Sequence, residues 1–267
     1  MRVYHPIAPY QGISPENVFC AADDMGTEIG AGYVIHFYQP DLFPDRPVNL
    51  YIQMDAQPSA RYMLLGALLA RAQQLRDQTP YLKARIYAQA GVDDARTCDF
   101  YLHNGFQMDD AEDMVRLEML EGAGKVPMSC TVANVPLASE YEQNAFLYRL
   151  NMNRIAPLNL GFLDVCRQKP HFLALGIYRN GQVAGELLMS GEGYRCDVIA
   201  MYVHPSCRRM GMAKGLLGRG MDMMRQEGVS QVNGLVLRRS IPQCALAHSF
   251  NAKFLKTTAL YPGMNLG

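Results

Sequence analysis

Apolar residues in the second half of the chain follow two spacings, one typical of helices and one typical of strands. Tyr141, Ala145 and Tyr148 recur at i, i+4 and i+7, which predicts an amphipathic helix. Residues 198–203 are apolar throughout, which predicts a central strand that is buried on both faces. The complete pattern predicts strands at 128–135, 171–178, 182–189, 194–203, 229–237 and 254–260, and helices at 138–151, 159–167, 211–226 and 242–251. This order is typical of an α/β domain with a mixed sheet.

The first half of the chain shows a shorter version of the same order. It predicts strands at 17–22, 30–38, 48–54, 82–88 and 113–119, and helices at 59–76 and 93–104. The opening strand and helices of the second half have no counterpart there. Gly122, Gly124 and Pro127 interrupt the pattern in the way that a linker does. We therefore expect a truncated domain over residues 1–121 and a complete domain over residues 127–267.

Composition narrows the classes of protein to which the chain can belong. Of its 267 residues, 49% are hydrophobic and 19% are charged, which is typical of a globular protein. The 25 basic and 25 acidic residues balance, which argues against a protein that is specialised for binding nucleic acid. We expect no membrane span and no signal peptide, because the chain has no run of 18 apolar residues and no apolar stretch at its N-terminus. The 7 cysteines include no C-x-x-C pair, which indicates reduced thiols, no zinc site and a cytoplasmic location.

One segment carries a recognisable chemistry, the turn between the predicted strand 194–203 and the predicted helix 211–226. It reads Arg208-x-x-Gly211-x-Ala213. The N-terminus of a helix has unpaired N–H groups and a partial positive charge, which favour a bound anion such as pyrophosphate. Glycine and alanine allow a ligand to approach the backbone closely. Arginine adds charge-assisted hydrogen bonds to phosphate oxygens.

This segment resembles the acyl-CoA-binding signature of the GNAT superfamily of N-acyltransferases, Arg/Gln-x-x-Gly-x-Gly/Ala. The resemblance covers residues 128–267 well and residues 17–120 more faintly. It implies an α/β fold with two GNAT-like domains, each a mixed, mostly antiparallel sheet flanked by helices. It also implies acetyl-CoA as co-substrate, without a metal ion. The residues that it assigns to the cofactor are Met201, Tyr202, Val203, Arg208, Arg209, Met210, Gly211, Met212 and Ala213.

The first half resembles the same family at its end and departs from it at the phosphate loop. Residues 99–106 resemble the family's penultimate helix, and residues 113–118 resemble its closing strand. The counterpart of the phosphate loop reads Arg61-x-x-Leu64-x-Gly66, with leucine in place of the first glycine. Since that side chain would crowd the pyrophosphate, we expect a degenerate N-terminal copy and a working site in the C-terminal copy.

Proton transfer is less well marked in the sequence. In many relatives a glutamate on the central strand is the general base, and here Ile199 stands in that place. Asp197 on the same strand, Glu186 on the neighbouring strand and His204 at the strand end are the alternatives. Relatives often use a tyrosine on the penultimate helix as the general acid, and here Ser249 holds that place.

Two functions of different classes follow from the resemblance. The first is an acetyl-CoA-dependent N-acetyltransferase that transfers an acetyl group to a primary amine of a small molecule or peptide by direct attack. The alternative is a non-catalytic acyl-CoA-binding or scaffolding protein, because Ile199 and Ser249 replace the usual base and acid. Nucleic-acid recognition is a weaker third hypothesis, since the basic residues do not cluster. The sequence names neither the acceptor nor the oligomeric state.

Overall fold

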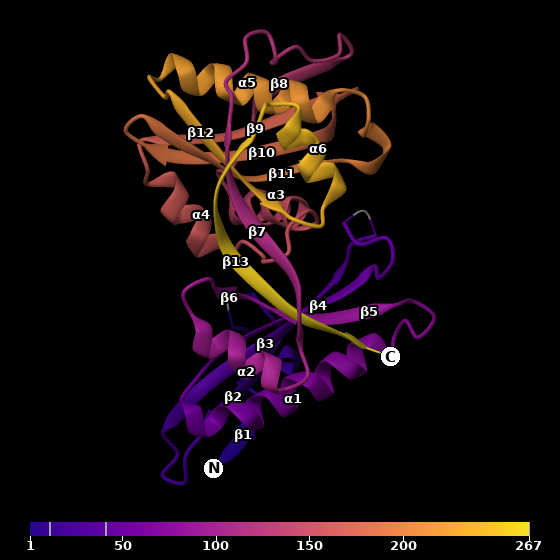
Figure 1. The fold of residues 1–267 in the computed structure, drawn as a ribbon, viewed down its shortest axis with the longest axis vertical. Coiled ribbons are helices and arrows are strands. Elements are labelled where there is room, and N and C mark those ends of the chain that lie inside the picture. The colour runs from indigo at the N-terminus through magenta and orange to yellow at the C-terminus, as the bar shows by residue number, and fades with distance from the viewer. Residues whose placement is uncertain (11, 41, 267) are drawn as a thin grey trace. The chain divides into compact units, whose positions relative to one another are not determined.

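The chain folds into two compact units, and the first unit contains both ends of the chain. The computed structural model describes residues 1–10, 12–40 and 42–266. Contacts between Cα atoms divide the chain into a first unit, residues 1–110 with 259–267, and a second unit, residues 111–258. Each unit has its own strands and its own helices (Figure 1).

The second unit is a six-stranded segment of sheet with helices on both faces. Its strands, in spatial order, are β7 (Gln107–Leu117), β12 (Gln231–Leu237), β11 (Arg195–Val203), β10 (Gln182–Glu192), β9 (His171–Arg179) and β8 (Cys130–Asn134). Its helices are α3 (Glu140–Asn151), α4 (Leu160–Arg167), α5 (Met212–Gln226) and α6 (Ile241–His248). The pair β11–β12 is parallel, whereas the other neighbouring strands are antiparallel.

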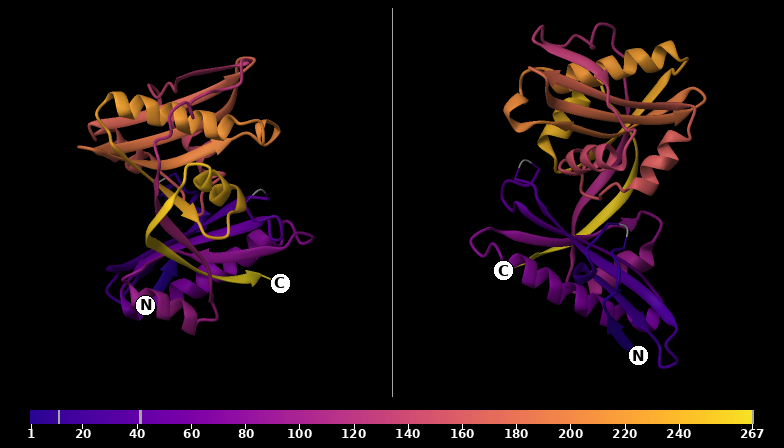
Figure 2. Two further views of the ribbon diagram at one scale, coloured as in Figure 1. Left: turned by 45° about the horizontal axis from the view of Figure 1, so that its top comes forward. Right: turned by 180° about the vertical axis from the view of Figure 1, so that it is seen from behind.

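Two apolar clusters hold the helices of the second unit on opposite faces of its sheet. Leu216, Leu217 and Met221 of α5 pack with Leu187 and Val203 of the sheet. The second cluster joins α3 and α4 to the other face of the same strands, through Phe146, Leu150, Leu163, Leu188 and Tyr202. Figure 2 shows the long helix α5 on one side of these strands. The prediction that the strand ending at residue 203 is central is confirmed, because β11 lies between β10 and β12.

The first unit repeats the central part of this arrangement. Its strands, in order, are β1 (Arg2–Tyr4), β2 (Val18–Ala22), β3 (Glu28–Tyr38), β4 (Val48–Ala56), β5 (Ala84–Ala88) and β13 (Lys253–Leu266), and the short β6 (Ala90–Gly91) also pairs with β13. The helices α1 (Pro58–Arg76) and α2 (Ala95–His103) pack on one face through Leu65, Leu68, Ala72, Tyr101 and Phe106. As in the second unit, a helix connects two parallel strands, here β4 and β5.

Local sequence explains where several helices begin. Ser139 and Glu142 form a capping box at the start of α3, since each side chain accepts from the other residue's backbone N–H. Asn159 caps α4 by accepting from the N–H of Phe162, and Asp94 caps α2 in the same way. These caps supply partners for N–H groups that have none inside a helix.

The closing strands are exchanged between the two units. Residues 112–117 of β7 come from the first half of the sequence but pair with β12 in the second unit. Residues 263–266 of β13, at the C-terminal end, pair with β5 in the first unit. In Figure 1 the last, yellow part of β13 runs among the strands of the first unit. This differs from the expected division into residues 1–121 and 127–267, because a strand's location is decided by its hydrogen-bond partners and not by its sequence neighbours.

The expected phosphate loop of the first half is not a loop. The strand β4 ends at Ala56 and α1 begins at Pro58, so only Gln57 separates them. Arg61 and Leu64 therefore lie within α1, and Leu64 is fully buried against the sheet. Leucine at this position serves the core of the unit, and the connection leaves no turn that could surround a pyrophosphate.

Glycines on α5 allow the linker after β7 to lie directly on the helix. An added Cβ at Gly218 would meet the carbonyl carbon of Ala123 at 2.4 Å. An added Cβ at Gly215 would meet the carbonyl oxygen of Lys125 at 2.6 Å. Real Cβ atoms do not approach backbone atoms this closely, so the seam between helix and linker requires glycine at both positions.

We expect Gly218→Ala to lower the free energy of unfolding by about 1–3 kcal/mol, because the added methyl group would displace the linker backbone. Gly66→Ala in α1 is the matched control, since an added Cβ there meets nothing within 4 Å. That control should gain about 0.5–1 kcal/mol from helix propensity. Urea denaturation followed by circular dichroism measures both. Equal stabilisation of the two variants would show that the linker does not pack on α5.

Candidate functional site

The sheet of the second unit opens between two neighbouring parallel strands. Pairing of β11 with β12 runs from Arg195↔Gln231 to Val198↔Gly234 and stops there. Beyond Gly234, β12 pairs only with β7, and β11 pairs only with β10. The two strands therefore part after Val198. Among the described residues, no strand pairs with this side of β11 over residues 199–203.

A bulge in β11 marks the point where the strands part. Leu188 of β10 faces Ala200, while the next residue, Met189, faces Val198, so Ile199 is the extra residue. A bulge bends its strand and increases the local twist, which directs β11 away from β12. The backbone N–H of His204 donates to the carbonyl oxygen of Ala184 on β10. In an antiparallel pair, alternate residues direct their backbone N–H and C=O groups to opposite sides of the strand. The backbone groups of Met201 and Val203 therefore point away from β10, toward the opening.

Side chains of the second unit donate hydrogen bonds to the carbonyl oxygens along this edge of β11. Nη1 of Arg154 donates to the carbonyl oxygen of Ile199 at 2.5 Å, and Nδ2 of Asn153 donates to that of Met201 at 3.3 Å. Nε of Arg208 donates to the carbonyl oxygen of Val203 at 3.1 Å. Of the three strand residues assigned to the cofactor, Met201 and Val203 thus face the opening. Tyr202 instead pairs with Glu186 of β10 and packs under α3.

The turn after β11 presents an uncapped helix N-terminus. Gly211 has φ +79° and precedes α5, and no side chain caps this end of the helix. The first hydrogen bond of the helix runs from the N–H of Gly215 to Gly211, which leaves the N–H groups of residues 212–214 without a helical partner. Arg209 has φ +59°, a conformation that costs a non-glycine residue about 1–3 kcal/mol and is concentrated at functional sites. An added Cβ on Gly211 meets nothing within 4 Å, so the backbone is open on this side.

A cavity of about 330 Å³ lies beside this helix N-terminus. Its walls are the linker, Leu120, Glu121, Gly122, Ala123 and Lys125, and the start of α5, Gly211, Lys214 and Gly215. It brings lysines from two parts of the sequence to one hollow next to the expected phosphate turn. The linker thus contributes to the surroundings of the site, which the sequence pattern did not indicate.

Asp197 lies where the opening begins. It is half-buried on β11, one residue before the last paired position, and its Oδ1 accepts from Nδ2 of Asn233 on β12 at 2.9 Å. A carboxylate at this place is near the parting of the strands, as the sequence-based hypothesis requires.

Glu186 is fully buried and engaged in an ion pair. Nε and Nη2 of Arg149 on α3 each donate to one of its carboxylate oxygens at 2.7 Å. Burial raises the pKa of Glu186 above its ordinary value, although the hydrogen bonds and charge of Arg149 act in the opposite direction. Because both oxygens accept from Arg149, Glu186 connects β10 to α3, and this pairing is a structural role.

The serine in the place of the family's acid is engaged within its own helix. Oγ of Ser249 donates to the carbonyl oxygen of Leu246 at 2.7 Å, at the C-terminal end of α6. Ser240 at the other end of α6 is fully buried, and its hydroxyl has no hydrogen-bond partner among the described residues. His204 is exposed, and its Nδ1 lies 2.8 Å from Oγ of Ser206 in the turn after β11.

Sequence reasoning missed the side chains that line the opening from the α3 side and from α6. Asn153 and Arg154 follow α3, and Gln243 lies on α6, so these residues are far from the phosphate turn in the sequence. A polar residue in a connection between two helices carries no periodicity and matches no motif. Only the three-dimensional contacts with β11 reveal these residues.

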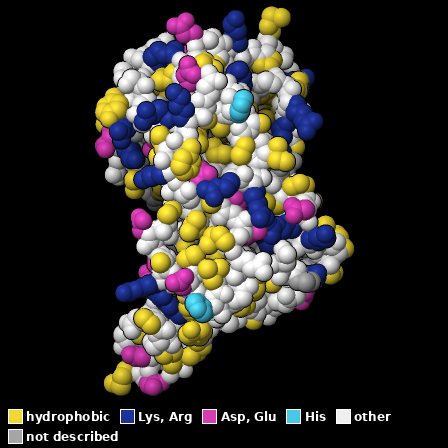
Figure 3. Space-filling model, viewed as in Figure 1, with side chains coloured by type: hydrophobic (Ala, Val, Ile, Leu, Met, Phe, Trp, Pro, Cys, Tyr) yellow, Lys and Arg dark blue, Asp and Glu magenta, His cyan; other side chains and the backbone are white. Residues whose placement is uncertain are grey.

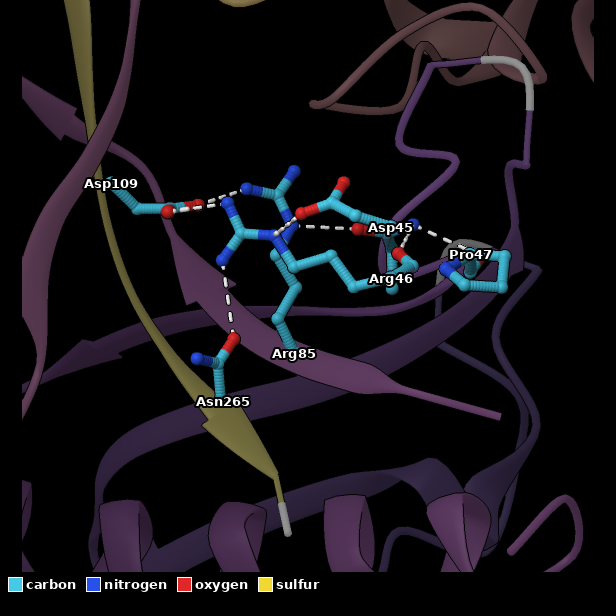
Figure 4. Close-up of polar contacts among 7 residues, drawn as sticks. Asp45, Arg46, Pro47, Arg85, Asp109 and Asn265 are labelled. Carbon is cyan, nitrogen blue, oxygen red and sulfur yellow. Dashed lines mark hydrogen bonds and ion pairs between the residues drawn. The ribbon is translucent and has the colours of Figure 1, made fainter. Parts of the chain in front are cut away.

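The first unit contains a buried charge cluster where its two shared strands meet β5. Arg46 and Arg85 both donate to Asp109 of β7, and Arg46 also donates to Oδ1 of Asn265 of β13 at 3.2 Å (Figure 4). Arg85 is fully buried, and its guanidinium lies 3.8 Å from the ring centre of Phe43. The cluster therefore holds β7 and β13 in place within the first unit.

Three further observations concern ligands and surfaces. No group of three or more potential metal-ligating side chains occurs among residues 1–10, 12–40 and 42–266. In the same ranges, no helix combines the length and apolar character needed to cross a membrane. On the face in Figure 3, basic side chains are interspersed with acidic and apolar ones. The expectation that the chain does not bind nucleic acid stays a prediction.

Comparison with known structures supports the fold. A probable N-acyltransferase of unknown function from Enterococcus faecalis is 12% identical, with a TM-score of 0.54 over 92% of this chain and 61% of that one. Eis1 from Mycobacterium abscessus is 13% identical, with a TM-score of 0.53 over 92% and 63%. A GCN5-related N-acetyltransferase from Sphaerobacter thermophilus is 14% identical, with a TM-score of 0.46 over 95% and 82%. At these identities the likeness shows the fold alone. This chain spans less than two thirds of the first two proteins.

The sequence comparisons place the family resemblance in the second unit. No curated protein matches the chain. The model of the acetyltransferase (GNAT) family matches residues 138–247, which run from the start of α3 to α6. This range includes the bulge, the opening and the turn before α5. The matched range lies within the second unit, so this part of the chain is similar to the acetyltransferase (GNAT) family.

Proposed function

We propose that the second unit is an acetyl-CoA-dependent N-acetyltransferase that acts on a primary amine. The observation that carries the proposal is the free edge of β11 beside the uncapped N-terminus of α5, within the range that matches the family. The N–H groups of residues 212–214 and the side chains of Arg208 and Arg209 suit the pyrophosphate. The polar groups of Met201 and Val203 suit the amide groups of the pantetheine arm.

The roles of the chain's own residues follow from their positions. The backbone of β11 after the bulge would hold the thioester, so that its N–H groups stabilise negative charge on the carbonyl oxygen. Asp197 would take a proton from the acceptor ammonium, directly or through a water molecule. The amine forms a C–N bond as the C–S bond breaks, and the leaving group is the CoA thiolate. Ser249 is already engaged, whereas the hydroxyl of Ser240, the residue before α6, has no hydrogen-bond partner among the described residues and would donate to that thiolate.

We infer that the first unit is a degenerate copy of the same fold that binds no acyl-CoA. It has the parallel pair β4–β5 and the connecting helix α1, but only one residue separates β4 from α1. The unit also lacks counterparts of α3 and α4 in its element order. A stoichiometry of one acetyl-CoA per chain is therefore expected.

Calorimetric titration with acetyl-CoA tests the proposed site. We expect Gly211→Glu to weaken binding about a hundredfold, because it places a carboxylate beside the pyrophosphate. The matched control is Gly228→Glu at the other end of α5, where the glycine also has positive φ (+87°) and open space around it. Equal losses in both variants would indicate a general effect on α5, and absence of binding to the unmodified protein would refute the proposal.

Release of CoA thiol in the presence of a panel of primary amines separates the enzyme from a non-catalytic acyl-CoA-binding protein. The panel should include amino acids, peptides, polyamines and aminoglycosides. Thiol release that depends on one class of amine would identify the acceptor. Binding without release for every amine would favour the non-catalytic alternative.

A further inference from the structure

A chain of hydrogen bonds crosses the opening between β11 and β12. The N–H of Leu237, at the end of β12, donates to Oε1 of Gln243 at 2.8 Å. Nε2 of Gln243 donates to the carbonyl oxygen of Asn153 at 3.1 Å. Nδ2 of Asn153 then donates to the carbonyl oxygen of Met201 on β11 at 3.3 Å. The two strands that part at Val198 are thus joined again by side chains of α6 and of the connection between α3 and α4.

The connection, which we call the bridging loop (residues 152–158), is held in a defined shape. Asn151 closes it at the base, since Oδ1 accepts from the N–H of Leu158 at 2.8 Å and Nδ2 donates to the carbonyl oxygen of Leu158 at 2.9 Å. Nε of Arg154 donates to the carbonyl oxygen of Ala156 at 3.0 Å. Ile155 is 1% exposed and anchors the loop in the interior. These contacts present Asn153 and Arg154 to the edge of β11 as one unit.

The bridging loop and a ligand arm need the same acceptors. Asn153 and Arg154 donate to the carbonyl groups of Met201 and Ile199, the part of β11 that has lost β12. An arm with amide N–H groups that pairs with this edge would have to donate to these oxygens from the same side. A carbonyl oxygen has two lone pairs, but an arm that pairs along the edge must place its own atoms where the side chains of Asn153 and Arg154 now lie, so the two compete for this space.

We infer that the bridging loop is a latch that closes the opening and withdraws when acyl-CoA binds. This inference rests on the proposed function, because the ligand that displaces the latch is the one proposed for the site. The closed state engages Asn153 and Arg154 with β11, and the open state releases both. Acyl-CoA binds only the open state and shifts the population toward it, so closure lowers the apparent affinity.

The test compares acetyl-CoA binding by the complete chain and three variants. Asn153→Ala/Arg154→Ala removes both donors, and Gln243→Ala loosens the latch from α6 without altering β11 or the bridging loop. The matched control, Asn144→Ala/Arg167→Ala, removes the same residue types at exposed positions on α3 and α4. Thermal unfolding confirms that each variant is folded.

We expect the Asn153→Ala/Arg154→Ala variant to bind acetyl-CoA about tenfold more tightly, since two competing hydrogen bonds are lost. Gln243→Ala should give a smaller gain of about threefold, and the control should bind as the unmodified protein does. Hydrogen exchange gives a second readout: saturating acetyl-CoA should speed exchange at the amide of Leu158, whose N–H donates to Asn151. A merely structural loop would show slower or unchanged exchange.

The outcomes separate the latch from the proposed function. Equal affinities in all four proteins, or weaker binding by the double variant at positions 153 and 154, would overturn the latch and leave the acyl-CoA site standing. No binding to any of the four proteins would overturn both. Tighter binding that is confined to the latch variants supports both.

Discussion

Asp109→Ala is expected to lower the free energy of unfolding by about 3–5 kcal/mol, the effect of removing one partner from a buried ion pair. Asp109 accepts from Arg46 and Arg85, whose side chains are 13% and 0% exposed. Without the carboxylate, the fully buried guanidinium of Arg85 and the partly buried guanidinium of Arg46 lose the anion that they share. The loss should appear in urea denaturation followed by tyrosine fluorescence, because the chain has no tryptophan.

Asp45→Asn is the matched control for this cluster. Asp45 also approaches Arg46, at 3.8 Å, but its side chain is 77% exposed. An exposed pair contributes little, so the control should differ from the unmodified protein by no more than about 0.5 kcal/mol. Comparable losses at positions 45 and 109 would contradict the assignment of the stabilising contact to the buried carboxylate.

At acidic pH, the difference in free energy of unfolding between the unmodified protein and Asp109→Ala should become smaller. Burial alone would raise the pKa of Asp109, but Arg85 and Arg46 together hold that pKa below its ordinary value. A lowered pKa in the folded state gives stability above the unfolded value, about 3.9, and this stability is lost as pH falls through the folded value. The unmodified protein therefore loses its advantage below about pH 4.

Arg149→Ala is the substitution with the second large expected effect, and it should lower the free energy of unfolding by about 3–5 kcal/mol at pH 7.5. Glu186 has a side chain that is 1% exposed and would keep an unpaired negative charge inside the second unit. Arg167→Ala on α4 removes an exposed arginine from the same unit and should have an effect of no more than about 0.5 kcal/mol. Urea denaturation of both variants measures the difference.

The pH dependence of Arg149→Ala identifies the cause of the loss. Burial already raises the pKa of Glu186, and removal of Arg149 takes away the opposing effect. A raised pKa in the folded state gives stability that is complete below the unfolded value, about 4.3, and is lost as pH rises. The variant should therefore recover as pH falls toward the unfolded value, because the raised pKa makes Glu186 neutral before that value is reached. A loss that does not change with pH would point to packing of the arginine stem.

Much of the local structure could be predicted from the sequence. The capping box at Ser139 and the glycine at position 228 mark the limits of helices, and the wholly apolar run at 198–203 marks an inner strand. These features depend on residues close together in the chain, so a short window contains their causes. The phosphate turn belongs to the same class, because its arginines and Gly211 are neighbours in the sequence.

The candidate catalytic residues were only partly determined in this way. Glu186 met the chemical requirement for a base, but its bidentate pairing with Arg149 on another element could not be read from spacing. Ser249 matched a place in the family pattern, yet its hydroxyl turns back to its own helix. The roles proposed for Asp197 and Ser240 depend on where β11 and β12 part, which is a property of strand pairing.

By itself, the sequence determined the order of helices and strands, the turn before α5 and the resemblance of the second half to the GNAT family. Only the tertiary structure decided that β7 and β13 are exchanged between units, that the sheet opens at the Ile199 bulge, and that Asn153 and Arg154 cover the exposed edge. The physical reason is the same in each case. Hydrogen bonds between strands, and side chains that reach across them, join residues that are distant in the chain, and their free energy depends on the whole fold and not on any local pattern.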